Sequence, residues 1–352
     1  MKKNPFDARL KAFADALEKN FLDAAVVFSQ HNIRALTGVD CDNACLLVTR
    51  KQILFYTDFR YVPAVERLAP YLVIADIAKL SGKKPLSVRG LKFAKVGYEA
   101  SVPHSLYLRL EKVFPKAELV DIEGELIALR AVKTESEIAA IKAAARLNDR
   151  IWAEASSQFA PGMTERDMAR KIKRLMIDYG DGEAFETIVC IGENAAECHH
   201  VPDDTLWDGR KPILVDMGVK LGGYASDMTR NIVGPRPSKL YRKVYDLVRE
   251  ANERAIAAAK SGITAAKLDA VARNFLSKNS FGKAFGHSLG HGVGLEVHEA
   301  PGVSKKSKTV LKPGMVITIE PGVYLLGNLG VRVEDLVLIT EDGCEVLSSS
   351  AK

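Results

Sequence analysis

The sequence LVDMGVKLGGYASDMT, residues 214–229, places two aspartates in an apolar strand pattern that two glycines interrupt. Asp216 and Asp227 are eleven residues apart, and their midpoint falls between Leu221 and Gly222, where glycine favours a turn. A hairpin closed at that point would bring the two aspartates directly opposite each other, with Cβ atoms about 4.5–5.5 Å apart. This stretch therefore predicts a β-hairpin with a facing pair of carboxylates.

A second stretch, ITIEPGVYLLGNLGVRVEDLV at 317–337, repeats the arrangement. Glu320 and Glu334 are equidistant from Gly327, so a turn there predicts that they too are cross-strand neighbours. Facing like charges destabilise a sheet, and one such pair alone is typical of a solvated hairpin face. Two pairs in strands rich in valine and isoleucine instead indicate that a cation compensates the charge.

Histidines concentrate in the same part of the chain. Five of the seven histidines lie between residues 199 and 298, and they are His199, His200, His287, His291 and His298. Carboxylates with an imidazole form an oxygen-rich, fairly hard ligand set, which favours Mn²⁺, Co²⁺ or Fe²⁺ and also accepts Zn²⁺. So much negative charge suits two cations that share bridging carboxylates, about 3.5–4 Å apart. We therefore expect two divalent metal ions, with manganese as the first choice.

The chain has 352 residues, of which 47% are hydrophobic and 27% charged, a composition that predicts a globular protein of two domains. In the first third, helical patterns alternate with short apolar runs of strand length. The predicted helices are 5–19, 60–69 and 102–113, and the predicted strands are 24–29, 44–49, 52–57 and 71–76. This pattern predicts a small α/β domain with a mixed sheet and a structural or substrate-capping role.

The pattern changes near residue 130. Thr134 with Glu137 three residues later forms a capping box before a predicted helix at 134–157, and Thr164 caps the next helix. Further helices are predicted at 238–260 and 264–279, and strand pairs lie between and after these helices. The second part is therefore an α+β domain. We expect the boundary between 122 and 132, which gives domains 1–126 and 127–352.

Several other classes are disfavoured. No apolar run exceeds five residues, against the roughly 20 that span a bilayer, and the start MKKNPFDARL has no apolar signal segment. Five cysteines without a CxxC pair indicate a reducing cytoplasm. The net charge of +6 is scattered, and its one tight cluster, Lys305, Lys306 and Lys308, lies in a serine-rich loop. We expect no nucleic-acid or membrane partner.

Four motifs in order resemble one known family. They are DMG-x₇-SDMTR (216–230), GHSLGHGVGLEVHE (286–299), TIEPGVY (318–324) and GVRVEDLVLIT (330–340). They resemble the "pita-bread" metallopeptidases, the group of methionine aminopeptidase, aminopeptidase P and prolidase. The size of the first domain, and the stretch LRAVKTESEIAAIKAAA at 129–145, are similar to the proline-specific branch. The resemblance implies a C-terminal pita-bread (creatinase/aminopeptidase-like) catalytic domain behind a smaller N-terminal α/β domain of the creatinase/prolidase type.

The resemblance also implies a ligand set. Its members match the family's metal-binding positions, and they are Asp216, Asp227, His291, Glu320 and Glu334. Asp227 and Glu334 would bridge the two ions, Asp216 would complete one site, and His291 with Glu320 would complete the other.

Further positions match residues around the substrate in this family. His298 matches the histidine that assists the tetrahedral intermediate, and His199 matches the histidine on the proline side. His287 matches a pocket-lining position and Arg332 an arginine behind the ligands. Glu320, His298 and His199 are therefore the expected catalytic residues. The expected substrate-binding residues are His199, His287, His298 and Arg332.

Two neighbouring residues carry weaker implications. His200 follows His199 and is expected to be incidental to the site. Tyr324 lies either behind the ligands or in the core, and the sequence favours neither.

The implied chemistry is hydrolysis. A water that bridges two divalent cations has its pKa lowered towards neutrality and becomes hydroxide. Glu320 would take its proton and pass it to the leaving imide nitrogen, while His298 would stabilise the oxyanion. The nitrogen of proline carries no hydrogen and its ring fixes φ. Peptidases that hold an extended chain through that N–H therefore fail at proline, which needs its own enzyme.

Other members of this fold fit less well. Methionine aminopeptidases lack a comparable first domain, and creatinase and the metal-free binding or chaperone proteins lack the ligand set. Prolidases of this length often resemble HEWPR after the histidine strand, whereas this chain has HEAPGV, with Gly302 at the arginine position. We therefore expect an Xaa-Pro aminopeptidase that acts on proline-containing peptides, with Xaa-Pro dipeptidase as the alternative. In that alternative, Lys305 or Lys306 would replace the missing arginine. The resemblance further implies a homodimer.

Overall fold

A computed structural model describes residues 6–49, 52–80 and 93–352. The chain divides into two compact units, Met1–Arg130 and Ala131–Lys352. The boundary expected after residue 126 falls inside helix α5 (Glu123–Ala131). Within the described ranges, no helix is both long enough and apolar enough to cross a lipid bilayer.

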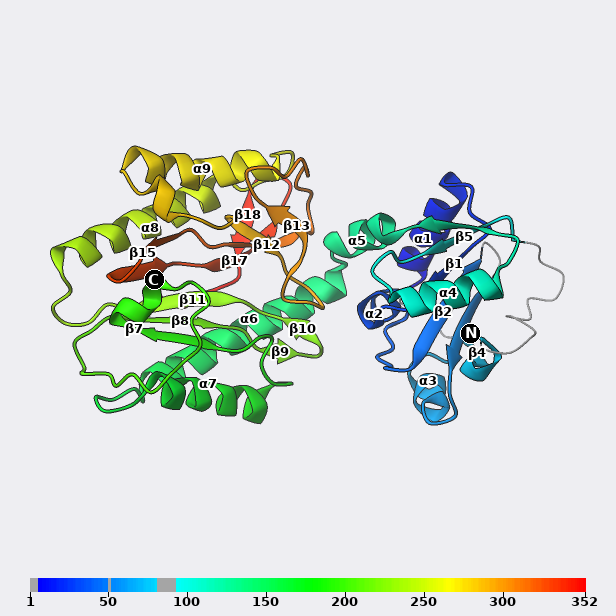
Figure 1. Cartoon of the computed structure of the whole chain (residues 1–352), viewed down its shortest axis with the longest axis horizontal. Coiled ribbons are helices and arrows are strands. Elements are labelled where there is room, and N and C mark those ends of the chain that lie inside the picture. Colours follow the sequence, from blue (N-terminus) through cyan, green and yellow to red (C-terminus); the bar gives the residue numbers. More distant parts are fainter. Residues whose placement is uncertain (1–5, 50–51, 81–92) are drawn as a thin grey trace. The chain divides into compact units, whose positions relative to one another are not determined.

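The N-terminal unit is built on one mixed sheet with the strand order β4-β3-β2-β1-β5-β6 (Figure 1). Its strands are β1 (Ala24–Val27), β2 (Ala44–Thr49), β3 (Ile53–Thr57), β4 (Val73–Asp76), β5 (Lys95–Tyr98) and β6 (Glu118–Asp121). β1 pairs antiparallel with β2 and parallel with β5, so the sheet is mixed as predicted. Every residue of β1 is buried, which is typical of a strand covered on both faces.

Helices cover both faces of this sheet. They are α1 (Asp7–Lys19), α2 (Gln30–Thr37), α3 (Val62–Leu68), α4 (His104–Val113) and α5, with a 3₁₀ turn at Ile77–Leu80. Phe13 of α1 packs with Ala25 and Val27 on one face, and Leu110 of α4 packs with Ala24 and Val26 on the other. The predicted first helix included Pro5, which lies outside the described residues.

The first half of the second unit places two long helices against a three-stranded sheet. The helices are α6 (Glu135–Ser156) and α7 (Glu165–Tyr179), and the strands are β7 (Ile188–Ile191), β8 (Ile213–Met217) and β11 (Met228–Ile232). Both helices begin at the predicted N-caps, Thr134 and Thr164, and the structure shows a capping box at each. Ile151, Met168 and Met176 pack on Val189 and Val215 of the sheet. The strand pair β9 (Lys220–Leu221) and β10 (Tyr224–Ala225) extends the β8–β11 hairpin, and a 3₁₀ turn at Gly192–Ala196 follows β7.

The second half repeats this arrangement. Helices α8 (Lys239–Ala258) and α9 (Ala265–Lys278) pack on a five-stranded sheet with the order β13-β12-β14-β17-β18. Its strands are β12 (Gly290–Gly292), β13 (Glu299–Val303), β14 (Val316–Ile319), β17 (Asp335–Ile339) and β18 (Cys344–Val346). β15 (Gly322–Leu325) and β16 (Leu329–Arg332) form a separate pair, and a 3₁₀ turn spans Gly282–Ala284. These two halves form the predicted α+β domain.

The second predicted hairpin has the expected register. Ile319 pairs with Asp335 and Gly322 with Arg332, so Glu320 and Glu334 lie opposite each other between the two ladders. Gly327, at the predicted turn, has φ of 68°, a conformation that favours glycine.

The register predicted for the first hairpin is wrong by two residues. Asp216 pairs with Thr229 rather than with Asp227. Gly222 and Gly223 both have positive φ, 57° and 75°, so the two of them form the centre of a tight turn between Leu221 and Tyr224. A two-residue turn of this kind matches the twist of the strands and sets the register.

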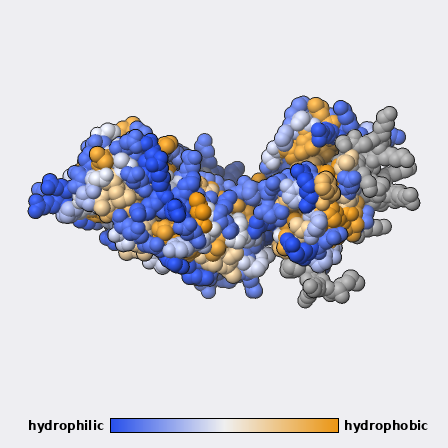
Figure 2. Space-filling view, turned by 90° about the horizontal axis from the view of Figure 1, so that it is seen from below, coloured by the Kyte–Doolittle hydropathy of each residue, from blue (hydrophilic) through white to orange (hydrophobic). Residues whose placement is uncertain are grey.

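The surface of the chain is mainly hydrophilic on the face drawn in Figure 2, and apolar patches lie among the charged residues. Several large apolar side chains of the N-terminal unit are exposed, and they include Phe21, Phe59, Leu68, Val73 and Leu108.

Candidate metal centre

One cavity of about 520 Å³ in the second unit brings the predicted site residues together. It is lined by all five expected metal ligands and by the four expected substrate-binding residues, namely Asp216, Asp227, His291, Glu320 and Glu334 with His199, His287, His298 and Arg332. Asp216 and Asp227 share the cavity although they are not cross-strand partners. These residues come from β8, β12, β16 and the loops beside them.

Three of the expected ligands form a tight group. Ligand atoms of Asp227, His291 and Glu334 all lie within 4.8 Å of one another. His291 Nε2 lies 3.6 Å from Asp227 Oδ2 and 3.3 Å from Glu320 Oε1. His291 therefore faces two carboxylates at once, which suits one cation held between them.

Burial and mutual repulsion shift the pKa values of this group. Burial raises the pKa of Glu320 to about 8. The positive charge of Arg332 lowers this pKa and the negative charge of Asp216 raises it further, but burial has the largest effect. Burial and the neighbouring carboxylates also raise the pKa values of Asp227 and Glu334 well above their ordinary range. Burial lowers the pKa of His291 to about 4, so this imidazole is neutral near pH 7, as a metal ligand requires.

The donor set fits divalent cations. Asp216 Oδ1 is buried and has no hydrogen-bond partner among the described residues. A buried carboxylate oxygen without a partner is costly, and a cation would satisfy it. Among the described residues, five acidic groups line the cavity, the four expected ligands and Glu186, against one guanidinium, that of Arg332. The positive charge that the protein supplies is therefore insufficient.

A network behind the ligands holds two carboxylates in place. Arg332 Nη2 donates to Asp216 Oδ2 at 2.7 Å, and Arg332 Nε donates to Thr229 Oγ1 at 2.9 Å. Thr229 in turn donates to Glu334 Oε2 at 2.6 Å. Burial opposes the charged form of Arg332, but the surrounding acidic groups hold its pKa above its ordinary value. Arg332 thus binds protein groups with its donors, and it positions Asp216 and Glu334.

Tyr324 belongs to this network and not to the apolar core. Its hydroxyl accepts a hydrogen bond from Arg332 Nη1 at 2.8 Å and lies 3.0 Å from His287 Nε2. Burial lowers the pKa of His287 to about 4. His287 is therefore a neutral, oriented side chain of the cavity wall.

The other two histidines are more exposed. His298 and His199 both line the cavity and are accessible to solvent. The rings of His298 and His291 lie 4.1 Å apart between centroids. His298 is thus beside the ligand group, and its own ring stays available to a bound molecule.

A buried carboxylate that the sequence did not single out supports the loop of His199. Glu165 Oε1 accepts hydrogen bonds from the backbone N–H of Ile191 at 2.6 Å and from Asn194 Nδ2 at 2.9 Å. Its Oε2 accepts from the N–H of Asp203 at 3.1 Å and lies 2.7 Å from His200 Nε2. His200, expected to be incidental, is a partner of this carboxylate.

Glu165, His200 and Asp203 also bring ligand atoms within 4.8 Å of one another. Both oxygens of Glu165 are already engaged by protein donors, so this group is a structural anchor for the loop. Thr229 is the other residue that the sequence analysis missed. It lies two residues after Asp227 and therefore on the same face of an extended chain, a signal that could have identified it.

The comparison with known proteins identifies the class. Residues 139–341 match metallopeptidase family M24, and residues 9–132 match the creatinase/prolidase N-terminal domain. The chain belongs to metallopeptidase family M24, in its proline-specific, pita-bread branch, and the family implies divalent metal ions.

Three relatives illustrate the similarity. An Xaa-Pro dipeptidase of Pyrococcus horikoshii is 33% identical over 98% of this chain and 97% of its own length. The structure of an Xaa-Pro dipeptidase from Bacillus anthracis has a TM-score of 0.93 at 32% identity and covers 99% of this chain and 98% of that one. The structure of an X-Pro aminopeptidase from Thermotoga maritima has a TM-score of 0.87 at 32% identity and covers 96% of this chain and 98% of that one.

Proposed function

We propose that this chain hydrolyses the peptide bond that precedes a proline, with two divalent cations as cofactors. The observation that carries the proposal is the convergence of the four expected carboxylate ligands and His291 in one cavity, where Arg332 is the one guanidinium contributed by the described residues. Asp216, Asp227, His291, Glu320 and Glu334 would hold the ions. Bound there, the cations would supply a water of lowered pKa and polarise the scissile carbonyl.

The protein's own groups have separate roles in this proposal. The carboxylate of Glu320 would take a proton from the attacking water and deliver it to the leaving nitrogen. His298, exposed to the cavity, would donate to the oxygen of the tetrahedral intermediate. His199 and His287 would line the space for the proline ring, and Arg332 would orient Asp216 through their contact of 2.7 Å.

We propose Xaa-Pro dipeptides as the main substrates, which replaces the expected aminopeptidase with its alternative. The support comes from relatives of nearly equal length that are named Xaa-Pro dipeptidase, including that of Pyrococcus horikoshii. Manganese as the native ion and a cytoplasmic location belong to the same proposal.

Action on longer Xaa-Pro peptides is a second candidate, and Gly302 favours it. Gly302 lines the cavity, and a side chain added there would meet nothing within 4 Å. Lys305 and Lys306 are not among the residues that line the cavity in the described part of the chain. A peptide extending past proline would find open space at this point, whereas the free carboxylate of a dipeptide would find no lysine.

Specificity constants for Xaa-Pro and Xaa-Pro-Xaa peptides decide between the two candidates. We expect a higher kcat/KM for the dipeptide. Gly302→Arg should raise the preference for the dipeptide further, by roughly tenfold, because the new guanidinium would bind its carboxylate. Gly124→Arg is a matched control, since this exposed glycine of α5 also has open space around it. A preference for the longer peptide in the unaltered enzyme would support the aminopeptidase instead.

A further inference from the structure

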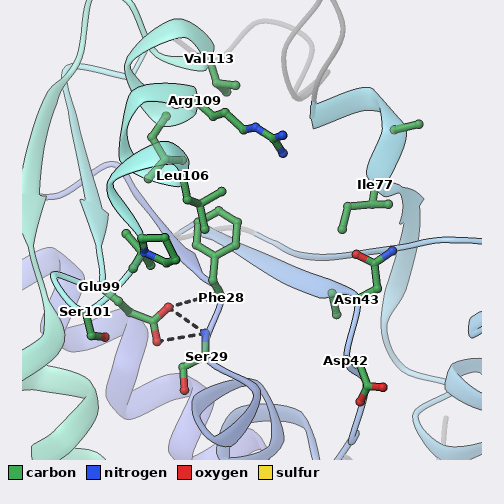
Figure 3. Close-up of a pocket in the computed structure, with 15 residues that line it drawn as sticks. Phe28, Ser29, Asp42, Asn43, Ile77, Glu99, Ser101, Leu106, Arg109 and Val113 are labelled. Atoms are coloured by element: carbon green, nitrogen blue, oxygen red, sulfur yellow. Dashed lines mark hydrogen bonds between the residues drawn. The ribbon is translucent and has the colours of Figure 1, made fainter.

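Buried carboxylates hold the backbone at several corners of this molecule. Glu99, in the wall of a cavity of the N-terminal unit, accepts from the backbone N–H groups of Phe28 at 2.5 Å and Ser29 at 3.0 Å (Figure 3). These two donors are uncharged. The carboxylate of Glu299 in the second unit differs, because a lysine binds it and because it directly follows His298.

Lys133 and Glu299 form a buried ion pair. Lys133 Nζ lies 2.6 Å from Glu299 Oε1, and 2% and 6% of the two side chains are exposed. Lys133 Nζ also donates to the backbone oxygen of Ala131 at 3.3 Å. Because the removal of one partner would leave a buried charge uncompensated, the two side chains hold each other in one arrangement.

The backbone around Lys133 is itself fixed. The N–H of Lys133 donates to the backbone oxygen of Gly314 at 2.9 Å, and the preceding residue, Val132, forms a β-bridge with Met315. Met315 directly precedes β14, the strand that leads to Glu320. The lysine is therefore anchored to the sheet that carries part of the metal centre.

Glu299 closes the connection between the two histidines of the metal centre. It pairs with Gly292, the residue after His291, in the ladder of β12 and β13. A Cβ atom at Gly294 would overlap Glu299 Oε1, so the carboxylate lies against the backbone of the connecting loop. The loop continues to His298, whose ring lies beside that of His291. The carboxylate therefore ties both ends of this loop together.

His298 and Glu299 face different sides of the chain. Successive side chains of an extended chain lie on opposite faces. Among the described residues, His298 lines the cavity of the metal centre and Glu299 does not. Holding Glu299 behind the strand therefore also sets the direction of His298 in front of it.

We propose that Lys133 is a positioning residue for His298 and acts through Glu299. The ion pair keeps the imidazole of His298 beside the metal centre, at the place where it donates to the oxygen of the tetrahedral intermediate. Lys133 itself contacts neither the ions nor the substrate. The inference rests on the proposed function, and it adds the pair of residues that holds one of the catalytic groups in place.

Kinetics with the dipeptide Leu-Pro test this assignment in Lys133→Met and in the double variant Lys133→Met with Glu299→Gln. The double variant has no unpaired buried charge, so it keeps the fold where the single variant loses stability. We expect two bound metal ions, a nearly unchanged KM and a kcat lowered about tenfold in both, a smaller loss than that from removing His298 itself. Lys142→Met is the matched control, because its ion pair with Glu345 is of the same length but exposed, and its kcat should not change.

The same substitution in a second background shows whether Lys133 acts through His298. In His298→Ala, the further change Lys133→Met should lower kcat by about twofold or less, because groups that act as a unit are not additive. A tenfold loss in both backgrounds would overturn the assignment. A double variant with the kcat of the unaltered protein would overturn it as well, since the pair would then serve only the fold.

The histidine resonances test the positioning role without any hydrolysis. In protein loaded with Zn²⁺, which is diamagnetic, the imidazole signals of His298 are identified by their loss in His298→Ala. They should shift in Lys133→Met and stay in place in Lys142→Met, and unchanged signals in Lys133→Met would overturn the positioning role. Shifted signals in a protein that does not hydrolyse Leu-Pro would support the positioning role and contradict the proposed function instead.

Discussion

The carboxylates of the metal centre have an environment that a cation would relieve. Glu334 accepts from Thr229, Asp216 accepts from Arg332, and Glu320 accepts from Thr318 Oγ1 at 3.1 Å. Each of these carboxylates keeps further acceptor capacity directed at the same cavity. The protein thus orients its acidic groups but neutralises their charge only in part, through Arg332 and Asp216.

The first prediction concerns the metal-free protein. The pKa values of Asp227, Glu320 and Glu334 are raised by burial, that of Glu320 to about 8. Between its ordinary pKa and the raised value, each group holds more protons in the folded than in the unfolded state. Below about pH 6.5 His287 and His291, whose pKa values are lowered to about 4, act in the opposite direction. The fall in stability is therefore expected mainly as the pH rises from about 6.5 towards about 8.

Unfolding of chelator-treated protein in urea at several pH values measures this effect. Added Mn²⁺ should restore stability at pH 8 and release protons. Equal stability of the metal-free protein at pH 6.5 and pH 8 would contradict the charge distribution described here.

The second prediction separates the two neighbouring histidines. His291→Ala should lose a metal ion and affect both kcat and KM, because His291 faces Asp227 and Glu320. His298→Ala should keep both ions and lose mainly kcat, by about 10²–10³, as for a donor that acts in the transition state. Metal analysis and steady-state kinetics of both variants give the answer. Loss of metal from His298→Ala would reverse the assignment, and an unchanged kcat would make His298 structural.

The four carboxylates of the candidate site could be singled out from the sequence because charged residues in apolar strands are costly. The roles of the histidines and of Arg332 were implied by the resemblance to the family. The partners behind them could not be predicted, since Thr229, Tyr324 and Glu165 are of types that occur throughout a protein. Their role arises only when segments distant in sequence meet, as Thr229 and Glu334 do.

The two hairpins show how much of the strand register can be deduced from the spacing of residues in the sequence. For Glu320 and Glu334 the turn is centred on one glycine, so the midpoint gives the register. For Asp216 and Asp227 the turn uses both Gly222 and Gly223, and the register moves by two residues. Spacing therefore identified the strands but not the turn type.

Long helices with clear caps and short strands with an unbroken apolar run were predictable, whereas other short elements were not. Helices α6 and α7 begin after the predicted N-caps Thr134 and Thr164, and strands β1 to β4 lie within or at the predicted apolar runs. In contrast, β5 and β6 have four residues each, with a glycine or a charge in the pattern, and α2 has eight. Such segments are stabilised by the sheet around them and not by their own sequence.

The third prediction belongs to the loop between β7 and β8. Glu165→Ala would leave the buried N–H of Ile191 and the half-buried N–H of Asp203 without this acceptor, and the buried group costs about 1–3 kcal/mol. We expect a loss of stability in urea unfolding and a lower kcat/KM, because the same loop carries His199. Glu253→Ala is the control, since its bond to Arg249 lies on the surface of α8 and contributes less than about 1 kcal/mol. If Glu165→Ala is as stable as the control variant, Glu165 does not anchor this loop.

The whole molecule combines the unit that carries the metal centre with an N-terminal unit, and each of the two has its own hydrophobic core. Exposed apolar side chains such as Phe59, which is 84% exposed, lie on the N-terminal unit. The expected homodimer remains a prediction. Light scattering should give twice the mass of the chain at working concentration, and a monomeric mass with full activity would contradict it.

Two divalent ions held by Asp216, Asp227, His291, Glu320 and Glu334 would make this chain a hydrolase of the Xaa-Pro bond. Titration of metal-free protein with Mn²⁺, with metal content and Xaa-Pro hydrolysis followed together, measures this dependence. Metal-free protein should show no hydrolysis, activity should saturate at two ions per chain, and Glu334→Ala should lose both metal binding and activity. Full activity in metal-free protein, or in Glu334→Ala, would contradict this dependence.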